Sequence, residues 1–140
     1  MKNKQPVIDE LLGAQTYPSD DGSTALTPED TRIAAAMQLA GNADIEIIGA
    51  LLRSLLTDSE EQVRRAVYDV ILGYECNDLS IAASLLVTGD EDDWLRQDAI
   101  GALERLDLEL AIEVSQTMKN DPDPYVAKIA TRILQESKTR

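Results

Sequence analysis

Two runs of carboxylates are the residues of this chain whose types first suggest chemistry. Asp90 to Asp93 is unbroken acidic sequence, and Asp121 and Asp123 flank Pro122. Carboxylate oxygens suit Ca²⁺, but neither run has the alternating Asp spacing and the distal Glu of a calcium loop. Each run stands where an apolar helical pattern begins, and carboxylates stabilise a helix N-terminus. We therefore interpret both runs as helix caps, and we expect neither a metal nor a cofactor.

Catalytic chemistry has little support in the sequence. The chain contains no histidine, which removes the commonest general base and metal ligand. The single cysteine, Cys76, has acidic neighbours that oppose thiolate formation, and the glycines form no phosphate-binding motif. We expect no enzyme activity and no catalytic residue. A lone cysteine, with no secretory signal and no apolar membrane span in the sequence, favours the cytoplasm.

A stripe of aromatic and polar residues recurs beside the apolar positions of the expected helices. Residues spaced by three and by seven share a face of a helix. Aromatic side chains beside Arg and Gln are typical of interface anchors. The sequence therefore predicts a partner-binding surface made of Gln62, Arg65, Tyr68, Asp69, Trp94, Gln97, Tyr125 and Lys128. Trp94 and Tyr125 would lie side by side in it; the alternative is that Trp94 only packs over the turn between two helices.

The helices that carry this stripe repeat along the chain. Arg32, Arg64 and Arg96 stand about 32 residues apart, and a fixed period of this length marks stacked repeats. Apolar residues four apart predict the buried side of each repeated helix. They are Val63, Val67 and Ile71; Leu95, Ala99 and Leu103; and Val126, Ala130 and Leu134. A further helix precedes each of these, over 45–56, 79–87 and 108–118, and we expect the N-caps at Thr27, Asp58 and Asp121.

These patterns predict an all-α fold in a single domain over 1–140. Residues 1–26 form an irregular start, with a helix near 7–12 and a polar loop at 15–26 that contains Pro and Gly. Residues 27–136 carry the helix-turn-helix units, and residues 137–140 fray. Signals for β-strands are nearly absent.

An Asp with an apolar residue five positions later and an Arg six positions later resembles the HEAT repeat in its short bacterial form. The residues that follow this pattern are Asp58, Val63 and Arg64, and Asp90, Leu95 and Arg96. The resemblance covers roughly residues 26–136. It implies a right-handed α-solenoid of about four helix-turn-helix repeats with an irregular first repeat, whose second helices line the concave side.

The resemblance also implies a ladder of Asp and Arg side chains between neighbouring repeats. A guanidinium removed from water is costly unless it is paired, and a carboxylate fits its fork. We expect Arg64 and Arg96 to pair with Asp58, Asp90 or Asp121.

The net charge of −13, from 26 acidic and 13 basic residues, limits the partners. Binding to phosphates depends on Lys and Arg, so we expect neither nucleic acid nor an anionic membrane surface. A basic protein partner fits this charge, although solubility alone also explains it.

Three functions remain open. The first is a non-catalytic protein-interaction module, as an adaptor or scaffold or as an immunity-type inhibitor of a basic protein. The second, which the family resemblance alone implies, is a subunit or chaperone of a bilin lyase or a related phycobilisome factor. The third is a self-associating structural protein, for which Ile129 and Ile133 offer extra apolar surface. A monomer and a weak homo-oligomer are both compatible with the sequence.

Overall fold

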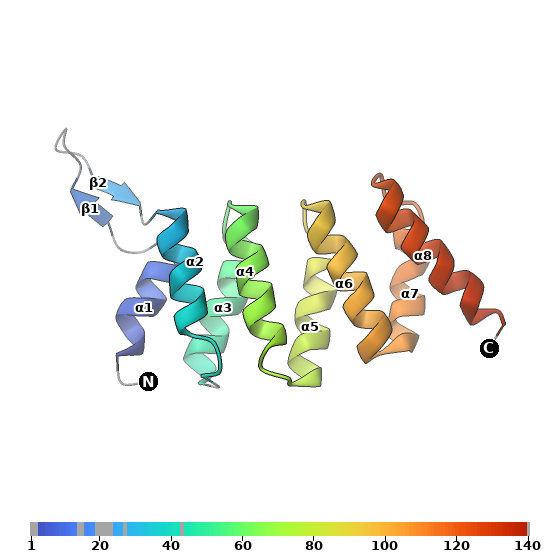
Figure 1. Ribbon diagram of the computed structural model, residues 1–140, viewed down its shortest axis with the longest axis horizontal. Helices are drawn as coiled ribbons and strands as arrows, with labels where there is room; N and C mark the ends of the chain where they lie inside the picture. Colours follow the sequence, from blue (N-terminus) through green and yellow to red (C-terminus); the bar gives the residue numbers. More distant parts are fainter. Residues whose placement is uncertain (1–2, 14–15, 19–23, 27, 43, 140) are drawn as a thin grey trace. The chain divides into compact units, whose positions relative to one another are not determined.

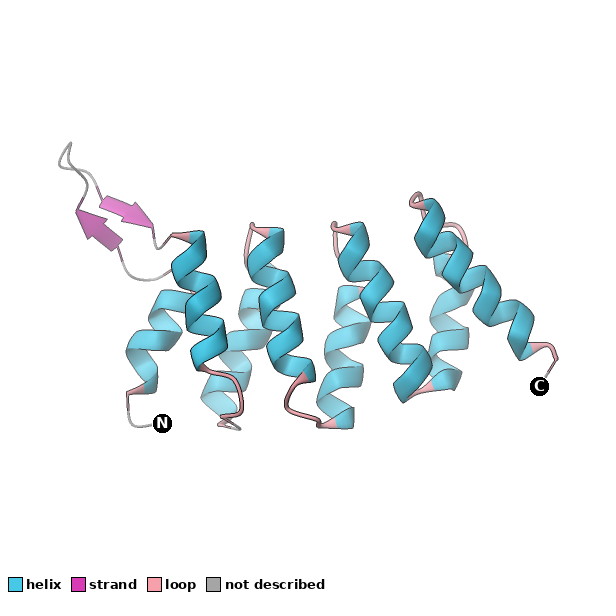
Figure 2. Cartoon of the chain, viewed as in Figure 1, coloured by secondary structure: helices cyan, strands magenta, loops and turns pink. Residues whose placement is uncertain are grey.

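The described part of the chain is all-α apart from one short hairpin of strands (Figures 1 and 2). The computed structural model describes residues 3–13, 16–18, 24–26, 28–42 and 44–139. The chain divides into two compact units, Met1–Glu75 and Cys76–Arg140, which we call the N-terminal and C-terminal units. Each unit is described by itself, and the expectation of a single domain stays a prediction.

The N-terminal unit contains four helices that pack in pairs. They are α1 (Lys4–Leu11), α2 (Glu29–Gln38), α3 (Ile45–Thr57) and α4 (Glu61–Leu72). Helix α2 packs against α1 and α4, and α3 packs against α1 and α4. Their buried positions are filled mainly by aliphatic side chains such as Leu11, Leu39, Leu51 and Val67. The expected apolar side of α4 is confirmed, since Val63, Val67 and Ile71 are fully buried.

A two-stranded hairpin lies in the segment that we expected to be a loop. Strands β1 (Thr16–Pro18) and β2 (Thr24–Leu26) pair antiparallel, with Tyr17 opposite Ala25. The prediction of a loop is therefore wrong for these residues. Thr and Tyr favour extended backbone, but strands of three residues are too short to show an alternating pattern. Residues 15 and 19–23 of the expected loop lie outside the described residues.

The C-terminal unit repeats the arrangement of paired helices. It contains α5 (Asn77–Val87), α6 (Asp93–Leu106), α7 (Leu108–Met118) and α8 (Pro124–Ser137). Helix α6 packs against α5, α7 and α8, and α7 packs against α8. Within this unit α6 and α8 form one layer and α5 and α7 the other (Figure 1).

The buried side of α8 differs from the expectation at one residue. Val126 and Ala130 are buried, but the third buried position is Ile133, and Leu134 is only half-buried. In a helix of 3.6 residues per turn, a step of four followed by a step of three keeps three side chains closer to one line than two steps of four do. Ile133 belongs to a cluster with Ile100 and Met118, and the half-buried Ile129 packs against it. The extra apolar surface that we expected from Ile129 and Ile133 is therefore largely used inside this unit.

The second helices begin two residues later than expected. The N-caps are Glu60 for α4 and Asp123 for α8, not Asp58 and Asp121. The carboxylates of Asp58 and Asp121 instead accept the backbone N–H two residues on, each at 2.9 Å. This local bond holds the intervening turn and delays the first helical residue. Thr27, the third expected cap, lies outside the described residues.

Candidate functional site

An ion pair joins α2 to the turn between α3 and α4 in the N-terminal unit. Arg32 donates from Nε to Asp58 Oδ2 at 2.9 Å and from Nη2 to Asp58 Oδ1 at 3.2 Å. Both side chains are mostly buried. Arg64 donates from Nη1 to the backbone carbonyl of Asp58 at 2.9 Å. The carboxylate of Asp58 thus holds Arg32, a residue that the expected ladder did not include.

The C-terminal unit contains the same network in the same local form. Arg96 donates from Nε and Nη2 to the two oxygens of Asp121, both at 2.9 Å. Its Nη1 donates to the backbone carbonyls of Asp90 and Glu91, also at 2.9 Å. This two-pronged contact is the strongest geometry for an arginine and a carboxylate. It fixes the start of α8 against α6.

This contact changes the protonation of both partners. The pKa of Arg96 is raised above its usual value, chiefly by the hydrogen bond to Asp121. Burial acts to raise the pKa of Asp121. The bonds from Arg96 and from the Asp123 N–H outweigh it, so this pKa falls below its usual value. The carboxylate of Asp121 is therefore ionised over the whole neutral range.

A second arginine–carboxylate pair lies farther along α6 and α8. Because of these two pairs we call α6 and α8 the clamped helices. Arg132 donates from Nη2 to Glu104 Oε1 at 2.8 Å and from Nη1 to Glu104 Oε2 at 2.9 Å. Arg132 also reaches Glu136 at 3.0 Å within α8. These hydrogen bonds, the one to Glu104 foremost, raise the pKa of Arg132. Arg132–Glu104 therefore joins α6 to α8 directly, and Arg96–Asp121 joins α6 to the turn that precedes α8.

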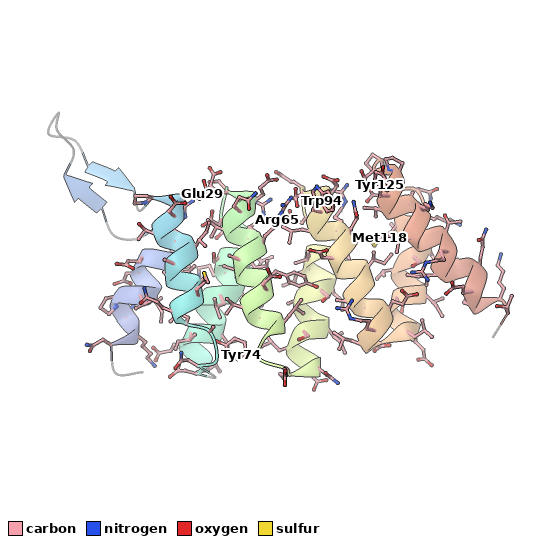
Figure 3. The ribbon with its side chains drawn as sticks, viewed as in Figure 1. Glu29, Arg65, Tyr74, Trp94, Met118 and Tyr125 are labelled. Carbon is pink, nitrogen blue, oxygen red and sulfur yellow. The ribbon has the colours of Figure 1, made fainter. Side chains whose placement is uncertain are left out.

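Trp94 and Tyr125 are the exposed aromatic residues of these clamped helices. Trp94 is 58% exposed and Tyr125 is 65% exposed. Each directly precedes the first buried residue of its helix, Leu95 or Val126, whose backbone N–H is capped by Asp92 or Asp123 respectively. The two side chains therefore hold equivalent places, and both lie at the same end of the C-terminal unit (Figure 3).

Two polar residues of the expected surface lie close to these aromatics. Gln97 is half-buried and donates from Nε2 to Asp123 Oδ2 at 3.4 Å, which adds a third link between α6 and α8. Lys128 is exposed on α8. The structure thus brings Trp94, Gln97, Tyr125 and Lys128 together on one unit. We call these four residues the aromatic end.

The remaining residues of the expected surface lie on α4 in the other unit. Gln62 and Asp69 are exposed and Arg65 is half-buried. Tyr68 is 1% exposed, so its assignment to a binding surface is wrong. Tyr68 follows the buried Val67 directly, and the broad buried arc of α4 takes in both positions. The residues spaced by three and by seven, Gln62, Arg65 and Asp69, thus remain outside the buried arc, whereas Tyr68 lies inside it.

Sequence reasoning missed a second class of exposed residue, the large aliphatic side chains on the first helices. Ile45 and Leu56 of α3 are 86% and 60% exposed, and Leu85 and Leu86 of α5 are also exposed. Both helices are apolar on nearly all sides, and this is the signal that was available.

The grooves of the described surface are shallow and open. One of about 510 Å³ lies beside the Arg32–Asp58 pair and includes Arg53 and Ser54 in its lining. Another, of about 370 Å³, lies between α2 and α4 and is mostly apolar, with Met37 in its lining. A third of about 470 Å³ runs over α8. None encloses a small molecule on most sides, as a cofactor or substrate site does.

The described residues contain no group of three His, Cys, Asp or Glu side chains that could hold a metal ion. No helix among them is long and apolar enough to cross a membrane.

The comparisons with known proteins found no relative of this chain. No protein-family model, no curated protein and no solved structure matches it.

Proposed function

We propose that the chain is a non-catalytic protein-interaction module that binds a basic segment of a partner protein at its aromatic end. As its architecture we propose a right-handed α-solenoid of about four HEAT-like repeats with an irregular first repeat. The recurrence of one Asp–Arg network in both units supports that architecture. A cytoplasmic location, which the lone cysteine favours, belongs to the same proposal.

The observation that carries the proposal is the pair of exposed aromatic residues on two clamped helices. A single exposed aromatic residue is common and needs no explanation. Trp94 and Tyr125 instead hold equivalent places on helices that Arg96–Asp121 and Arg132–Glu104 connect. Because their backbone positions are already fixed, binding would cost little further conformational entropy.

Charge at the aromatic end favours a cationic partner. Glu91 and Asp98 are exposed and Asp93 is half-buried around Trp94 on α6. The N-terminus of a helix carries about +0.5 charge, and Lys128 adds one positive charge; both oppose a cation, but the three carboxylates carry more charge than these two together. Arg or Lys of a partner could stack on Trp94 or Tyr125 while pairing with the neighbouring carboxylates, a cation–π contact worth about 0.5–2 kcal/mol.

The test uses Trp94 as its own reporter, because it is the only tryptophan of the chain. We expect its fluorescence to change when the protein is titrated with an arginine-rich peptide, and the affinity to fall as salt is added. Calorimetry measures the same binding for Trp94→Ala and Tyr125→Ala. Each variant is expected to weaken binding by about tenfold, the effect of losing roughly 1.4 kcal/mol.

The matched control is Gln62→Ala, because Gln62 precedes the buried Val63 on α4 just as Trp94 precedes Leu95 on α6. We expect this variant to bind the peptide as the unchanged protein does. Any acidic protein attracts a basic peptide weakly, so binding alone does not support a site at the aromatic end. Equal affinity of the Trp94→Ala, Tyr125→Ala and Gln62→Ala proteins would show that the aromatic end is not the site.

A further inference from the structure

Helix α3 carries an exposed apolar strip along its whole length. Ile45, Gly49, Leu52 and Leu56 follow one another at steps of four, three and four, the spacing of a seam between two helices. Ile45 and Leu56 are among the most exposed large apolar residues described, and Leu52 between them is half-buried. A Cβ added at Gly49 would meet no atom within 4 Å, so the middle of the strip is open to a close approach. We call these four residues the α3 strip.

One edge of the α3 strip carries two opposite charges. Glu46 and Arg53 are both exposed and stand seven residues apart, which places them on the same edge two turns from each other. Lys4 Nζ lies 2.7 Å from Asp44 Oδ2 and 3.3 Å from Glu46 Oε2, at the start of this edge. The Glu46 carboxylate remains mostly in water and can accept another donor. The other edge carries the half-buried Ile48 and borders the buried Leu55, so it is apolar.

This arrangement is complementary to itself. When two identical helices pair antiparallel about a two-fold axis, the same edge of each helix faces its copy, with the residue order reversed. An axis between Gly49 and Ala50 puts Glu46 opposite Arg53 of the second copy, and Arg53 opposite Glu46. Parallel pairing would instead set each charged edge against the apolar edge of the other helix.

We propose that two copies of this chain associate through the α3 strip, antiparallel, with two symmetric Glu46–Arg53 ion pairs. The aliphatic side chains of the strip leave water, and Gly49 lets the helix axes come close at the centre. Interfaces of this kind are isologous, since one patch serves both partners. A membrane is a poorer occupant, because the charged edge borders the strip in a chain of net charge −13. This association is separate from the binding proposed for the aromatic end.

Sedimentation of the full chain over the micromolar range tests the association. We expect a monomer–dimer equilibrium for the unchanged protein and a monomer for Leu56→Glu. Glu46→Arg and Arg53→Glu each place like charges opposite each other and are expected to weaken the dimer by about tenfold or more. The double change Glu46→Arg plus Arg53→Glu restores opposite charges and is expected to restore the dimer.

The matched control is Glu109→Arg, because Glu109 is the second residue of α7 as Glu46 is of α3. We expect it to leave the dimer unchanged, although it alters the net charge by the same amount. Circular dichroism confirms that each variant is folded. A monomer at every concentration overturns the proposal. So does a double variant that associates no more strongly than the two single variants, because that result means that Glu46 and Arg53 do not face each other across the dimer.

Discussion

The first helices α3 and α7 bury the same kind of surface but differ in how much apolar surface they expose. Each places an alanine and a serine four residues apart against its second helix, Ala50 with Ser54 and Ala111 with Ser115. The exposed side of α3 contains Ile45 and Leu56, whereas that of α7 contains the polar residues Glu109, Glu113, Gln116 and Thr117. The inner sides therefore obey one packing requirement, and the exposed sides are free to differ. Because α3 and α7 differ only on their exposed sides, we infer that those two sides face different surroundings.

The most severe test of the shared packing is to enlarge the small buried residues. Ala50→Leu in α3 and Ala111→Leu in α7 each force a branched side chain into a filled space between two helices. We expect each change to lower the free energy of unfolding by about 1–3 kcal/mol, the usual cost of overpacking. Urea denaturation measures it for both proteins. If one site tolerates leucine and the other does not, the two inner sides are not equivalent.

Lowering the pH tests how much the Arg96–Asp121 ion pair stabilises the C-terminal unit. Asp121 has a pKa below that of the unfolded chain, so its contribution is fully present above the unfolded value of about 3.9. That contribution disappears as the pH falls through the lower folded value. We expect Asp121→Asn to destabilise the protein by about 1–2 kcal/mol near neutral pH, because Arg96 keeps only part of its partner.

At a pH below the lowered pKa of Asp121 the same variant should differ little from the unchanged protein, because the original carboxyl is then protonated. Urea denaturation at both pH values gives the two differences. Lys119→Gln, an exposed charge near the same turn, is the control and is expected to have no effect at either pH. A penalty for Asp121→Asn that is equally large in acid would mean that shape, not charge, makes this contact important.

The repeated helices could be predicted from the sequence because their inner sides are regular. The expected segment 108–118 coincides with α7, and 45–56 falls one residue short of α3. Details that depend on one side chain's local bond were missed. The carboxylates of Asp58 and Asp121 bind the backbone two residues on, so both helices start later than a simple cap implies.

The candidate site was predictable only where exposure follows from helical position. Trp94 and Tyr125 precede a buried residue at a helix start and project outward. Tyr68 lies between the stripe positions Arg65 and Asp69, in the middle of α4, where the buried arc is wide enough to enclose it. The α3 strip was missed for the opposite reason. A helix that is apolar all round looks like core in a sequence, and only the packing tells which of its sides is covered.

The smallest expected effect concerns the two serines of the shared inner sides. Ser54 Oγ and Ser115 Oγ are buried and have no hydrogen-bond partner among the described residues. A buried hydroxyl without a partner costs free energy that alanine would not cost, while the two residues fill nearly the same space. We expect Ser54→Ala and Ser115→Ala each to leave stability within about 0.5 kcal/mol or to raise it slightly.

Ser84, which is buried at the equivalent place of α5 and takes part in a polar interaction, is the matched comparison. Ser84→Ala should lower the melting temperature, and a drop of the same size for all three variants would mean that Ser54 and Ser115 also bond within the folded chain.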